Sequence, residues 1–320
     1  MTDVVCLGRA VIDVMAKPIE NMPIKGEGCL VEFLEIHPGG SAVNTAIALA
    51  KLGINPAIIG VVGKDFFGDF LIKALIKEGV DIQFLRRTTK SNTSSSFVMI
   101  SQDGERSFFH YIGANSMVTP SIVDFSLLDG VKMLHVAPIN LMPSFKGEEA
   151  VGIMAKAKKS GLITSIDTTH NLDEIEFIRS CLKYTDIFLP NYNEAKKISG
   201  KESLREISEN LLAIGTRLVV IKMGDRGCYL RNKKVEMFVP GYQVNAVDTT
   251  GAGDAFVAGF LLGTLKGWEL NKTAKFANAV GAMCVQSIGS TSGIGNENLA
   301  LDFMRKAKVI ALKKFSIPLK

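Results

Sequence analysis

The chain has 320 residues, 47% hydrophobic and 22% charged, which is typical of a folded globular protein. Its net charge of +5 comes from 37 basic and 32 acidic residues spread along the chain, which disfavours a nucleic-acid surface and fits a small polyanionic ligand. No apolar run approaches a membrane span and no signal peptide precedes the first apolar segment. We therefore expect a cytoplasmic protein without a membrane partner.

Neither the cysteines nor the histidines show the spacing of a metal site. The five cysteines are isolated and odd in number, so we expect reduced and mostly buried thiols. Each of the four histidines is expected to be structural. These residues are Cys6, Cys29, Cys181, Cys228 and Cys284, and His37, His110, His135 and His170.

The first predicted strand, Val4–Leu7, is a short apolar run that ends at Gly8. No GxGxxG pattern follows it, which argues against a dinucleotide site. Asp13 ends the next apolar segment, at the predicted mouth of the sheet. It is either a solvated turn carboxylate or an acceptor for two hydroxyl groups of a ligand.

A glycine pair, Gly39-Gly40, separates a β-like stretch at Cys29–Ile36 from a predicted helix that ends near Gly53. Glycines at a strand-to-helix turn let a ligand approach the backbone closely. Asn44 lies one turn inside the helix and can both donate and accept hydrogen bonds. The alternative is a glycine-rich turn with an incidental asparagine.

A strand, a helix and a hairpin are predicted next. An Asp-Gly pair at 103–104 between two β-prone runs is a strong hairpin signal. Arg106, on the second hairpin strand, either reaches into a site or remains exposed. The elements are the strand Ala57–Val62, the helix Phe66–Lys77 and the hairpin strands Thr93–Ser101 and Glu105–Tyr111.

From residue 131 onward, strands alternate with helices, which predicts βαβ units and a mainly parallel sheet. Ligands of such sheets bind in the crevice at the carboxyl ends of the strands. The predicted strands are Val131–Val136, Leu162–Asp167, Asp186–Leu189 and Arg217–Ile221, and the helices are Gly147–Lys159 and Leu172–Leu182.

Polar and small residues follow two of these strands. Asn191 and Glu194 suit the water shell of Mg²⁺ near phosphates, the alternative being an ordinary helix start. Lys222 could pair with a phosphate, and Gly224 and Gly227 would border a triphosphate.

The most informative stretch follows a predicted hairpin (Cys228–Arg231 and Val235–Val239). Gly251-Ala252-Gly253 offers backbone amides at the start of an apolar helix, where an anion can bind. Asp254 stands beside these amides, placed to take a proton. An anion site next to a carboxylate base is what phosphoryl transfer to an alcohol needs, whereas the alternative is a loop with an aspartate helix cap.

This stretch, DTTGAGDAFVAGF at 248–260, resembles the signature of the ribokinase-like (PfkB) family of carbohydrate kinases. The resemblance covers nearly the whole chain, including GGxxxN at 39–44 and PNxxE at 190–194. It implies one α/β domain over residues 1–320 with a Rossmann-like ribokinase fold. A mainly parallel central sheet would be flanked by helices, and a small β-sheet lid would form from segments near 9–36 and 93–113. No P-loop GxxxxGK[ST] is present.

The resemblance also implies roles for individual residues, with ATP and Mg²⁺ as cofactors and K⁺ as a further candidate. The lid sheets of the family often pair into homodimers. The implied catalytic residues are Asp254, Gly251, Ala252 and Gly253, and the implied sugar-binding residues are Asp13, Gly39, Gly40, Asn44 and Arg106. The implied nucleotide-binding residues are Asn191, Lys222, Gly224, Gly227 and Asn278, the last on a helix predicted at Thr273–Gln286. The implied metal-site residues are Glu194 for Mg²⁺ through water, and Asp248 and Thr250 for K⁺.

The substrate class follows less directly. Residues 61–68 and 103–106 are similar to the fructokinase branch, and residues 110–115 to ribokinase-like members. Ketodeoxygluconate kinases usually carry a tyrosine–arginine pair after the hairpin, whereas Ile112 follows Tyr111 here, which argues against an acid substrate. We therefore expect fructose or ribose.

Other readings stay open. A nucleoside kinase, a 2-keto-3-deoxygluconate kinase and a non-catalytic sugar-binding regulator are the alternatives. Residues 167–171 read DTTHN where the family often has DPNxR, which leaves the substrate and some phosphate contacts unassigned.

Overall fold

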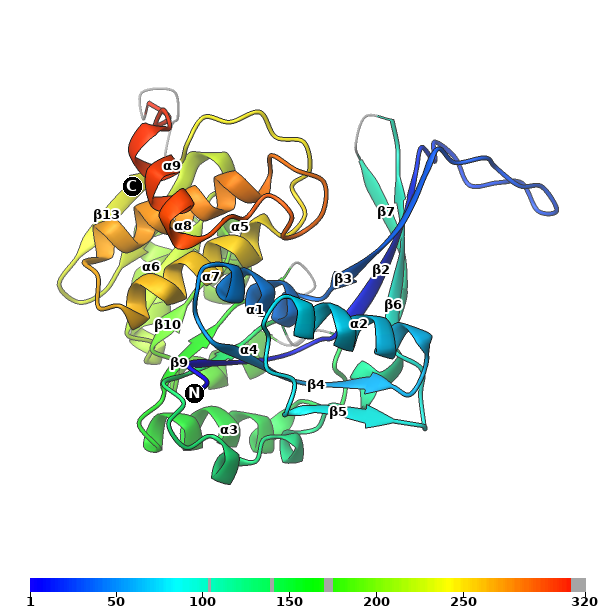
Figure 1. The fold of residues 1–320 in the computed structure, drawn as a ribbon. Coiled ribbons are helices and arrows are strands. Elements are labelled where there is room, and N and C mark those ends of the chain that lie inside the picture. The colour runs from blue at the N-terminus through cyan, green and yellow to red at the C-terminus, as the bar shows by residue number, and fades with distance from the viewer. Residues whose placement is uncertain (103–104, 139–140, 170–174, 312–320) are drawn as a thin grey trace.

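The computed structural model describes residues 1–102, 105–138, 141–169 and 175–311. Their strands form a central sheet of nine strands and a separate sheet of four (Figure 1). Among the described helices, none is both long and apolar enough to cross a membrane. Of the five cysteines, which are all free, Cys29 is exposed and the other four are buried.

The central sheet has the strand order β13-β12-β11-β10-β9-β8-β1-β4-β5. Pairing is parallel from β11 across to β5, whereas β12 and β13 form an antiparallel hairpin at one edge. This confirms the predicted parallel sheet and its hairpin. The strands are β1 Val4–Leu7, β4 Pro56–Gly63, β5 Leu85–Thr88, β8 Met133–Val136, β9 Ile163–Ile166, β10 Ile187–Phe188, β11 Leu218–Lys222, β12 Gly227–Arg231 and β13 Glu236–Pro240.

Two predicted helices, at 66–77 and 147–159, have the bounds found in the structure. The first begins where it does because the Asp65 side chain accepts a hydrogen bond from the Gly68 amide at 2.8 Å. The sequence patterns missed β5, α6 and α9, and residues 172–174 of one predicted helix lie outside the described residues. The helices are α1 Ser41–Lys51, α2 Phe66–Lys77, α3 Gly147–Lys159, α4 Ile175–Leu182, α5 Tyr192–Ser199, α6 Leu204–Ile214, α7 Ala252–Leu265, α8 Leu270–Cys284 and α9 Glu297–Lys306.

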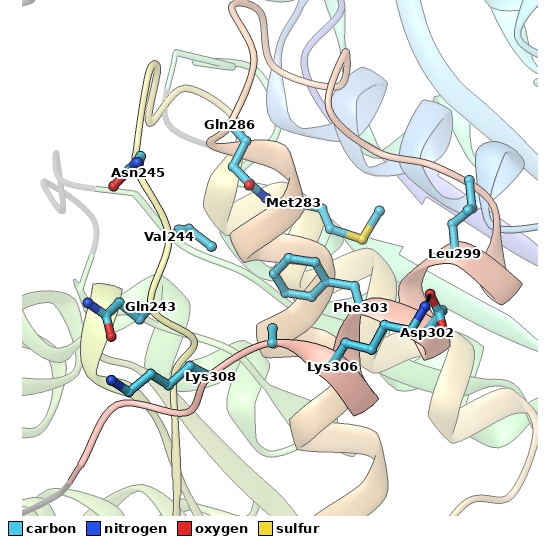
Figure 2. Close-up of a pocket in the computed structure, with 11 residues that line it drawn as sticks. Gln243, Val244, Asn245, Met283, Gln286, Leu299, Asp302, Phe303, Lys306 and Lys308 are labelled. Atoms are coloured by element: carbon cyan, nitrogen blue, oxygen red, sulfur yellow. Dashed lines mark ion pairs between the residues drawn. The ribbon is translucent and has the colours of Figure 1, made fainter.

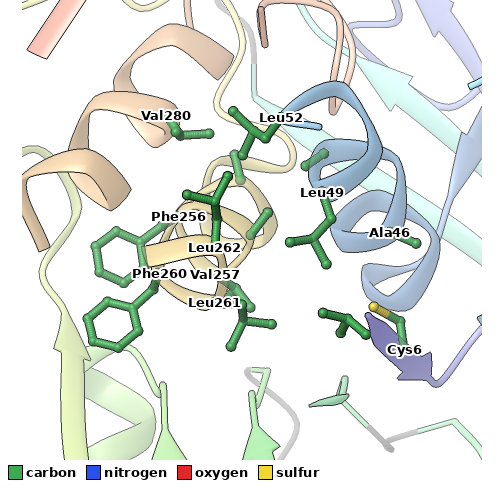
Figure 3. Close-up of a cluster of buried hydrophobic side chains, with 14 of the residues drawn as sticks. Cys6, Ala46, Leu49, Leu52, Phe256, Val257, Phe260, Leu261, Leu262 and Val280 are labelled. Atoms are coloured by element: carbon green, nitrogen blue, oxygen red, sulfur yellow. The ribbon is translucent and has the colours of Figure 1, made fainter. Parts of the chain in front are cut away.

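Helix α7 lies inside the molecule, packed against α1 and α8, and its apolar side chains point to both neighbours (Figure 3). A Cβ on Gly259 would lie 2.9 Å from the Ala277 Cα of α8, so this glycine lets the two helices approach closely. A helix that is hydrophobic on all sides is held by packing rather than by one face. The first turn of α7, which carries Asp254, is therefore fixed by the core.

The four-stranded sheet, called the lid sheet below, has the order β3-β2-β6-β7 and stands beside the central sheet (Figure 1). Its hairpin was predicted, although the Asp-Gly pair at 103–104 lies outside the described residues. The placement of Asp13 at the mouth of the central sheet was wrong, because Asp13 is the third residue of β2. The strands are β2 Val11–Lys17, β3 Phe33–Gly39, β6 Ser94–Ile100 and β7 Arg106–Tyr111.

Candidate active site

Asp254 lies in the first turn of α7 and is held by a chain of side chains. The Asn44 amide nitrogen of α1 donates to Asp254 Oδ2 at 2.8 Å, and the Ser290 hydroxyl donates to Asn44 Oδ1 at 2.9 Å. Burial raises the pKa of Asp254 to about 6, with Asp167 adding to the rise and Asn44 opposing it. A carboxyl group with this pKa can take up a proton near neutral pH.

The turn before Asp254 forms an anion cradle, residues 251–254. Gly251 has φ 75°, and a Cβ there would lie 2.2 Å from the Ser290 carbonyl oxygen, so both backbone conformation and packing require glycine. The Ala252 amide donates to the Thr249 carbonyl at 3.3 Å. Among the described residues, the Gly253 and Asp254 amides have no hydrogen-bond acceptor, as expected of a helix start that can bind an anion.

Lys222 supplies a positive charge over this cradle. Its Nζ would lie 3.6 Å from a Cβ placed on Gly253, and it donates to Asp167 Oδ1 at 2.6 Å. Burial opposes the charged form of Lys222, but Asp167 and Glu194 raise its pKa above the usual value. The predicted contact of Lys222 with a phosphate bound at the cradle is therefore sterically possible.

Asp167 is a site residue that the sequence analysis did not assign. It is 4% exposed at the carboxyl end of β9, and burial raises its pKa while Lys222 opposes the rise. The available signal was an acidic residue directly after a buried strand of a parallel sheet, which is where ligands of such sheets bind.

Glu194 and Asn191 form a capping box at the start of α5. Glu194 Oε2 accepts from the Asn191 amide at 2.8 Å and from the Thr168 hydroxyl at 2.9 Å, and Oε1 accepts from Asn191 Nδ2 at 2.7 Å. The alternative of a helix start is thus confirmed. The Mg²⁺ role of these residues stays a prediction, and Glu194 lies close enough to Lys222 to act on its charge.

Asp167 and Glu194 together fit a magnesium ion that arrives with phosphates. Within the described residues, no three acidic, histidine or cysteine side chains converge as a complete metal site. Mg²⁺ is commonly bound by one or two carboxylates together with waters and substrate phosphates. Asp167 and Glu194 could provide these carboxylates, with Glu194 acting through water because its oxygens already accept protein donors.

The predicted nucleotide-binding residues differ in what surrounds them. Gly224 has φ 61° with open space where a Cβ would lie, whereas a Cβ on Gly227 would lie 2.2 Å from the Val239 carbonyl. Gly227 is thus required by the hairpin packing. Asn278 is 7% exposed, and its amide nitrogen donates to the Val239 and Pro240 carbonyls at 3.1 Å each, tying α8 to β13. A contact of Asn278 with a base stays a prediction.

Among the predicted sugar-binding residues, both glycines of the pair at 39–40 make room for neighbouring groups. A Cβ on Gly39 would lie 2.1 Å from Asp13 Oδ2. Gly40 has φ 90°, and its Cβ would lie 2.4 Å from the Arg9 carbonyl oxygen. Gly39 therefore makes room for Asp13, whose pKa is raised by burial, and Gly40 makes room for the Arg9 backbone. Asn44 extends to Asp254 instead of standing free.

Asp13 belongs to a polar row that crosses the lid sheet. Its direct cross-strand neighbours are His37 on β3 and Ser96 on β6, and Ser96 in turn faces His110 on β7. The Ser96 hydroxyl lies 2.9 Å from His110 Nδ1 and also hydrogen-bonds the Asp13 carboxyl group. His110 thus borders the candidate site and is not only a core residue. Its spacing along the chain carried no signal for this position, because the polar row depends on strand register.

Arg106 contacts a different partner from the one predicted. Its guanidinium donates to the Thr250 hydroxyl, to Thr249 Oγ1 at 3.1 Å and to Asp248 Oδ1 at 3.5 Å, so it joins the lid sheet to the loop before the cradle. Asp248 also accepts from the Thr250 and Gly289 amides at 2.9 Å each, which together with Arg106 lowers its pKa although burial opposes this.

These contacts bear on whether the Asp248 and Thr250 side chains can act as ligands of K⁺. The Asp248 carboxylate already faces a guanidinium and several N–H and O–H donors, and the Thr250 hydroxyl is engaged by both Asp248 and Arg106. The two side chains therefore do not fit K⁺ ligands here, and no step below depends on that ion.

A separate cavity of about 770 Å³ lies between α9, the end of α8 and the loop at 243–245 (Figure 2). Its lining includes Phe303, Met283 and the Asp302–Lys306 ion pair at 2.8 Å. It contains none of the predicted site residues, so we assign it no part in the chemistry at Asp254.

Comparisons with known proteins agree with this geometry. Residues 1–296 match the family described as pfkB family carbohydrate kinase. Fructokinase-2 of Zea mays is 30% identical over 95% of this chain and 94% of its own length. An Escherichia coli protein described as a ribokinase II, solved with ATP and Mg²⁺, superposes with a TM-score of 0.84 at 25% identity over 96% of this chain and 100% of its own.

The ribokinase of Arabidopsis thaliana, solved with ribose and ATP, superposes with a TM-score of 0.83 over 95% of this chain and 99% of its own, at 24% identity. At that identity the likeness concerns the fold. The central sheet with its separate four-stranded lid sheet is therefore the fold of the ribokinases, as the sequence resemblance implied.

Proposed function

The chain belongs to the pfkB family of carbohydrate kinases and is a phosphotransferase acting on a sugar hydroxyl, and we propose that its acceptor is a small fructose- or ribose-like sugar. In this proposal ATP donates its γ-phosphoryl group and Asp254 is the general base. The observation that carries it is the joint position of a carboxyl group with a pKa of about 6, free helix amides and the Lys222 ammonium. Residues 1–320 act as one kinase domain with the lid sheet as its cover.

Asp254 takes the proton of the sugar hydroxyl as the new bond to phosphorus forms. The Asn44 amide donates to Oδ2, and Ser41 also hydrogen-bonds the carboxyl group. The sugar hydroxyl would use an acceptor position that these two groups leave on the carboxyl oxygens. Ser290 fixes Asn44 in turn. A base positioned in this way contributes roughly 10²–10⁴-fold to rate.

The transferring phosphoryl group meets the amides of Gly253 and Asp254 together with Lys222. These groups stabilise the negative charge that spreads over its oxygens during transfer. Mg²⁺, held with the phosphates by Asp167 and Glu194, would neutralise further charge when bound. The lid sheet reduces access of water, which would otherwise compete with the sugar as acceptor.

The test is ADP release measured over a panel of sugars and nucleosides with the wild type, Asp254→Asn and a control, Asp129→Asn, at an exposed aspartate. We expect turnover of at least one sugar, a loss of about 10²–10⁴ in kcat for Asp254→Asn, and no change for the control. Near-normal turnover by folded Asp254→Asn would exclude the base assignment. Sugar binding by the wild type without any ADP release would favour the regulator.

We further propose a homodimer formed through the outer face of the lid sheet. Val14, Ile36, Phe97 and Phe109 are cross-strand neighbours on the face opposite Asp13, and Phe97 and Phe109 are 38% and 55% exposed. Exposed aromatic groups of this kind mark interaction surfaces. Sedimentation should give a dimer for the wild type and a monomer for Phe109→Asp, whereas a monomeric wild type would exclude the pairing.

A further inference from the structure

Three buried polar nitrogens without partners gather on the sugar side of Asp254. They are Arg9 Nε, His110 Nε2 and Asn115 Nδ2. The Ala10 amide donates to Asn115 Oδ1 at 3.1 Å, which places Asn115 beside the backbone of Arg9. Buried polar groups are normally hydrogen-bonded, so three orphans in one place point to a ligand that would satisfy them.

Arg9 is the most unusual of the three. It lies in the three-residue connection Gly8–Ala10 between β1 and β2, with its backbone packed against Gly40. Its Nε has no hydrogen-bond partner, and no ion pair of Arg9 is found within the described part of the chain, although Asp13 and Asp254 both act on its charge. Burial lowers its pKa, but a guanidinium stays protonated and needs acceptors.

The hydrogen-bonding roles of the other two nitrogens follow from their neighbours. Because Asn115 Oδ1 accepts from Ala10, its Nδ2 is the donor left over. Ser96 hydrogen-bonds the Asp13 carboxylate, so its oxygen accepts from His110 Nδ1, and His110 Nε2 is then an acceptor. Arg9 and Asn115 thus seek an acceptor-rich group, whereas His110 suits a ligand hydroxyl.

The nucleotide does not explain Arg9. The charges that act on Arg9 are those of Asp254 and Asp13, whereas Lys222 is paired with Asp167 and Glu194 on the phosphate side. Arg9 also acts on the charge of His110, which is on the lid sheet. Asp254 therefore stands between two cations, and Arg9 is the one on the sugar side.

We infer that the sugar carries an anionic group, a carboxylate or a phosphate, which binds the Arg9 guanidinium and the Asn115 amide. This inference rests on the proposed function and narrows its substrate class. A guanidinium matches the paired oxygens of either group. The absence of an arginine after Tyr111 then no longer argues against an acid substrate, because the cation comes from the β1–β2 connection instead.

The experiment compares three substrates of similar size: the neutral sugar fructose, a 2-keto-3-deoxyhexonate and a hexose monophosphate. ADP release and calorimetric binding are measured for the wild type, Arg9→Gln and Arg9→Lys. We expect one anionic compound to exceed fructose by about 10²-fold in kcat/KM, and Arg9→Gln to remove that preference, as loss of a charged hydrogen bond predicts. Arg9→Lys, which keeps the charge but loses the paired N–H donors of the guanidinium, should retain part of the preference for the anionic compound. KM for ATP should remain within about threefold, since Arg9 does not face the nucleotide.

The two anionic arms identify whether carboxylate or phosphate is preferred. A preference for fructose in the wild type would overturn the inference and leave the proposed function standing. An equal loss for all three substrates in Arg9→Gln would also overturn it. Tight, Arg9-dependent binding of an anionic sugar without ADP release would uphold it and refute the kinase proposal, whereas neither binding nor turnover of an anionic sugar would refute the inference.

Discussion

The anion cradle and the root of the lid sheet differ in how their polar groups are satisfied. Around the cradle, Asp254 is held by Asn44, and Lys222 is paired with Asp167. At the root of the lid sheet, the half-buried side chains of Arg9 and His110 each carry a buried nitrogen that has no partner. The charged side chains of the cradle wall are thus paired within the protein, and only its backbone amides are free for an anion. On the lid side, side-chain nitrogens are left for whatever binds.

This difference separates chemistry from recognition. Preorganised groups cost no rearrangement when charge develops in the transition state, which suits the phosphoryl side. Unsatisfied groups penalise every molecule that fails to pair with them, which suits selection among similar sugars. The same fold can therefore keep its reaction while the root of the lid sheet changes substrate.

The largest expected effect follows from breaking the cradle wall. Lys222→Met would leave Asp167 and Glu194 buried without their cation, and removal of one partner from such a group costs about 3–5 kcal/mol. We expect a clearly lowered midpoint of thermal unfolding and no measurable turnover. Adding Asp167→Asn should restore part of the stability but not the activity; additive losses would show that the groups are not coupled.

On the lid side, the position of Asp13 depends on the small size of Gly39. Gly39→Ala places a methyl group 2.1 Å from the Asp13 carboxylate, so that carboxylate must move. Displacement of a binding group by about 1 Å can cost about 10²-fold, and we expect this in kcat/KM for the sugar with KM for ATP little changed. Gly28→Ala, at an exposed glycine that, like Gly39, has no positive φ but has open space around it, is the matched control.

The titration of Asp254 makes both the activity and the stability of the cradle wall depend on pH. With a pKa of about 6, the base is lost as pH falls, and kcat should drop about tenfold per unit below that value. Stability has the opposite sign: the folded-state pKa lies above the unfolded one, so the wild type becomes more stable as pH falls through about 6. Asp254→Asn should therefore unfold at a higher temperature than the wild type at pH 8, and this advantage should shrink at pH 5.

The smallest expected effect concerns the outer link of the cradle chain. Ser290→Ala removes the donor to Asn44 Oδ1 and loosens the orientation of Asn44 without touching Asp254. One neutral hydrogen bond is worth about 1 kcal/mol, so kcat should fall about fivefold. An unchanged kcat would show that packing alone orients Asn44.

Local motifs predicted the cradle wall better than the lid wall. Gly251–Asp254, Lys222 and the glycine pair were found because each lies at a strand end or helix start with its own local signature. Asp167 escaped because the residues after it depart from the expected pattern, although the end of β9 was predicted. Most strands of the central sheet were predicted from their apolar runs, whereas α6 was missed although Leu204, Ile207 and Leu211 recur with helical spacing.

The polar row of Asp13, Ser96 and His110 could not be predicted in the same way. Its members are neighbours only because β2 pairs with β6 and β6 with β7 in one register. A shift of one residue would send these side chains to the opposite face, and nothing in the separate segments specifies that register. Arg9 shares this property, since the residues near it, His110, Asn115 and Asp254, come from segments far along the chain.

The short connection between β1 and β2 has a mechanical consequence. A Cβ on Gly8 would lie 2.9 Å from the Cβ atoms of both Ala42 and Ala137, so the chain is wedged into the core where the second sheet leaves it. Any rotation of the lid sheet about this connection would displace the far end of the sheet most. Arg106, opposite Ile100 near that far end, would then lose its grip on residues 248–250 after a rotation that hardly moves Arg9.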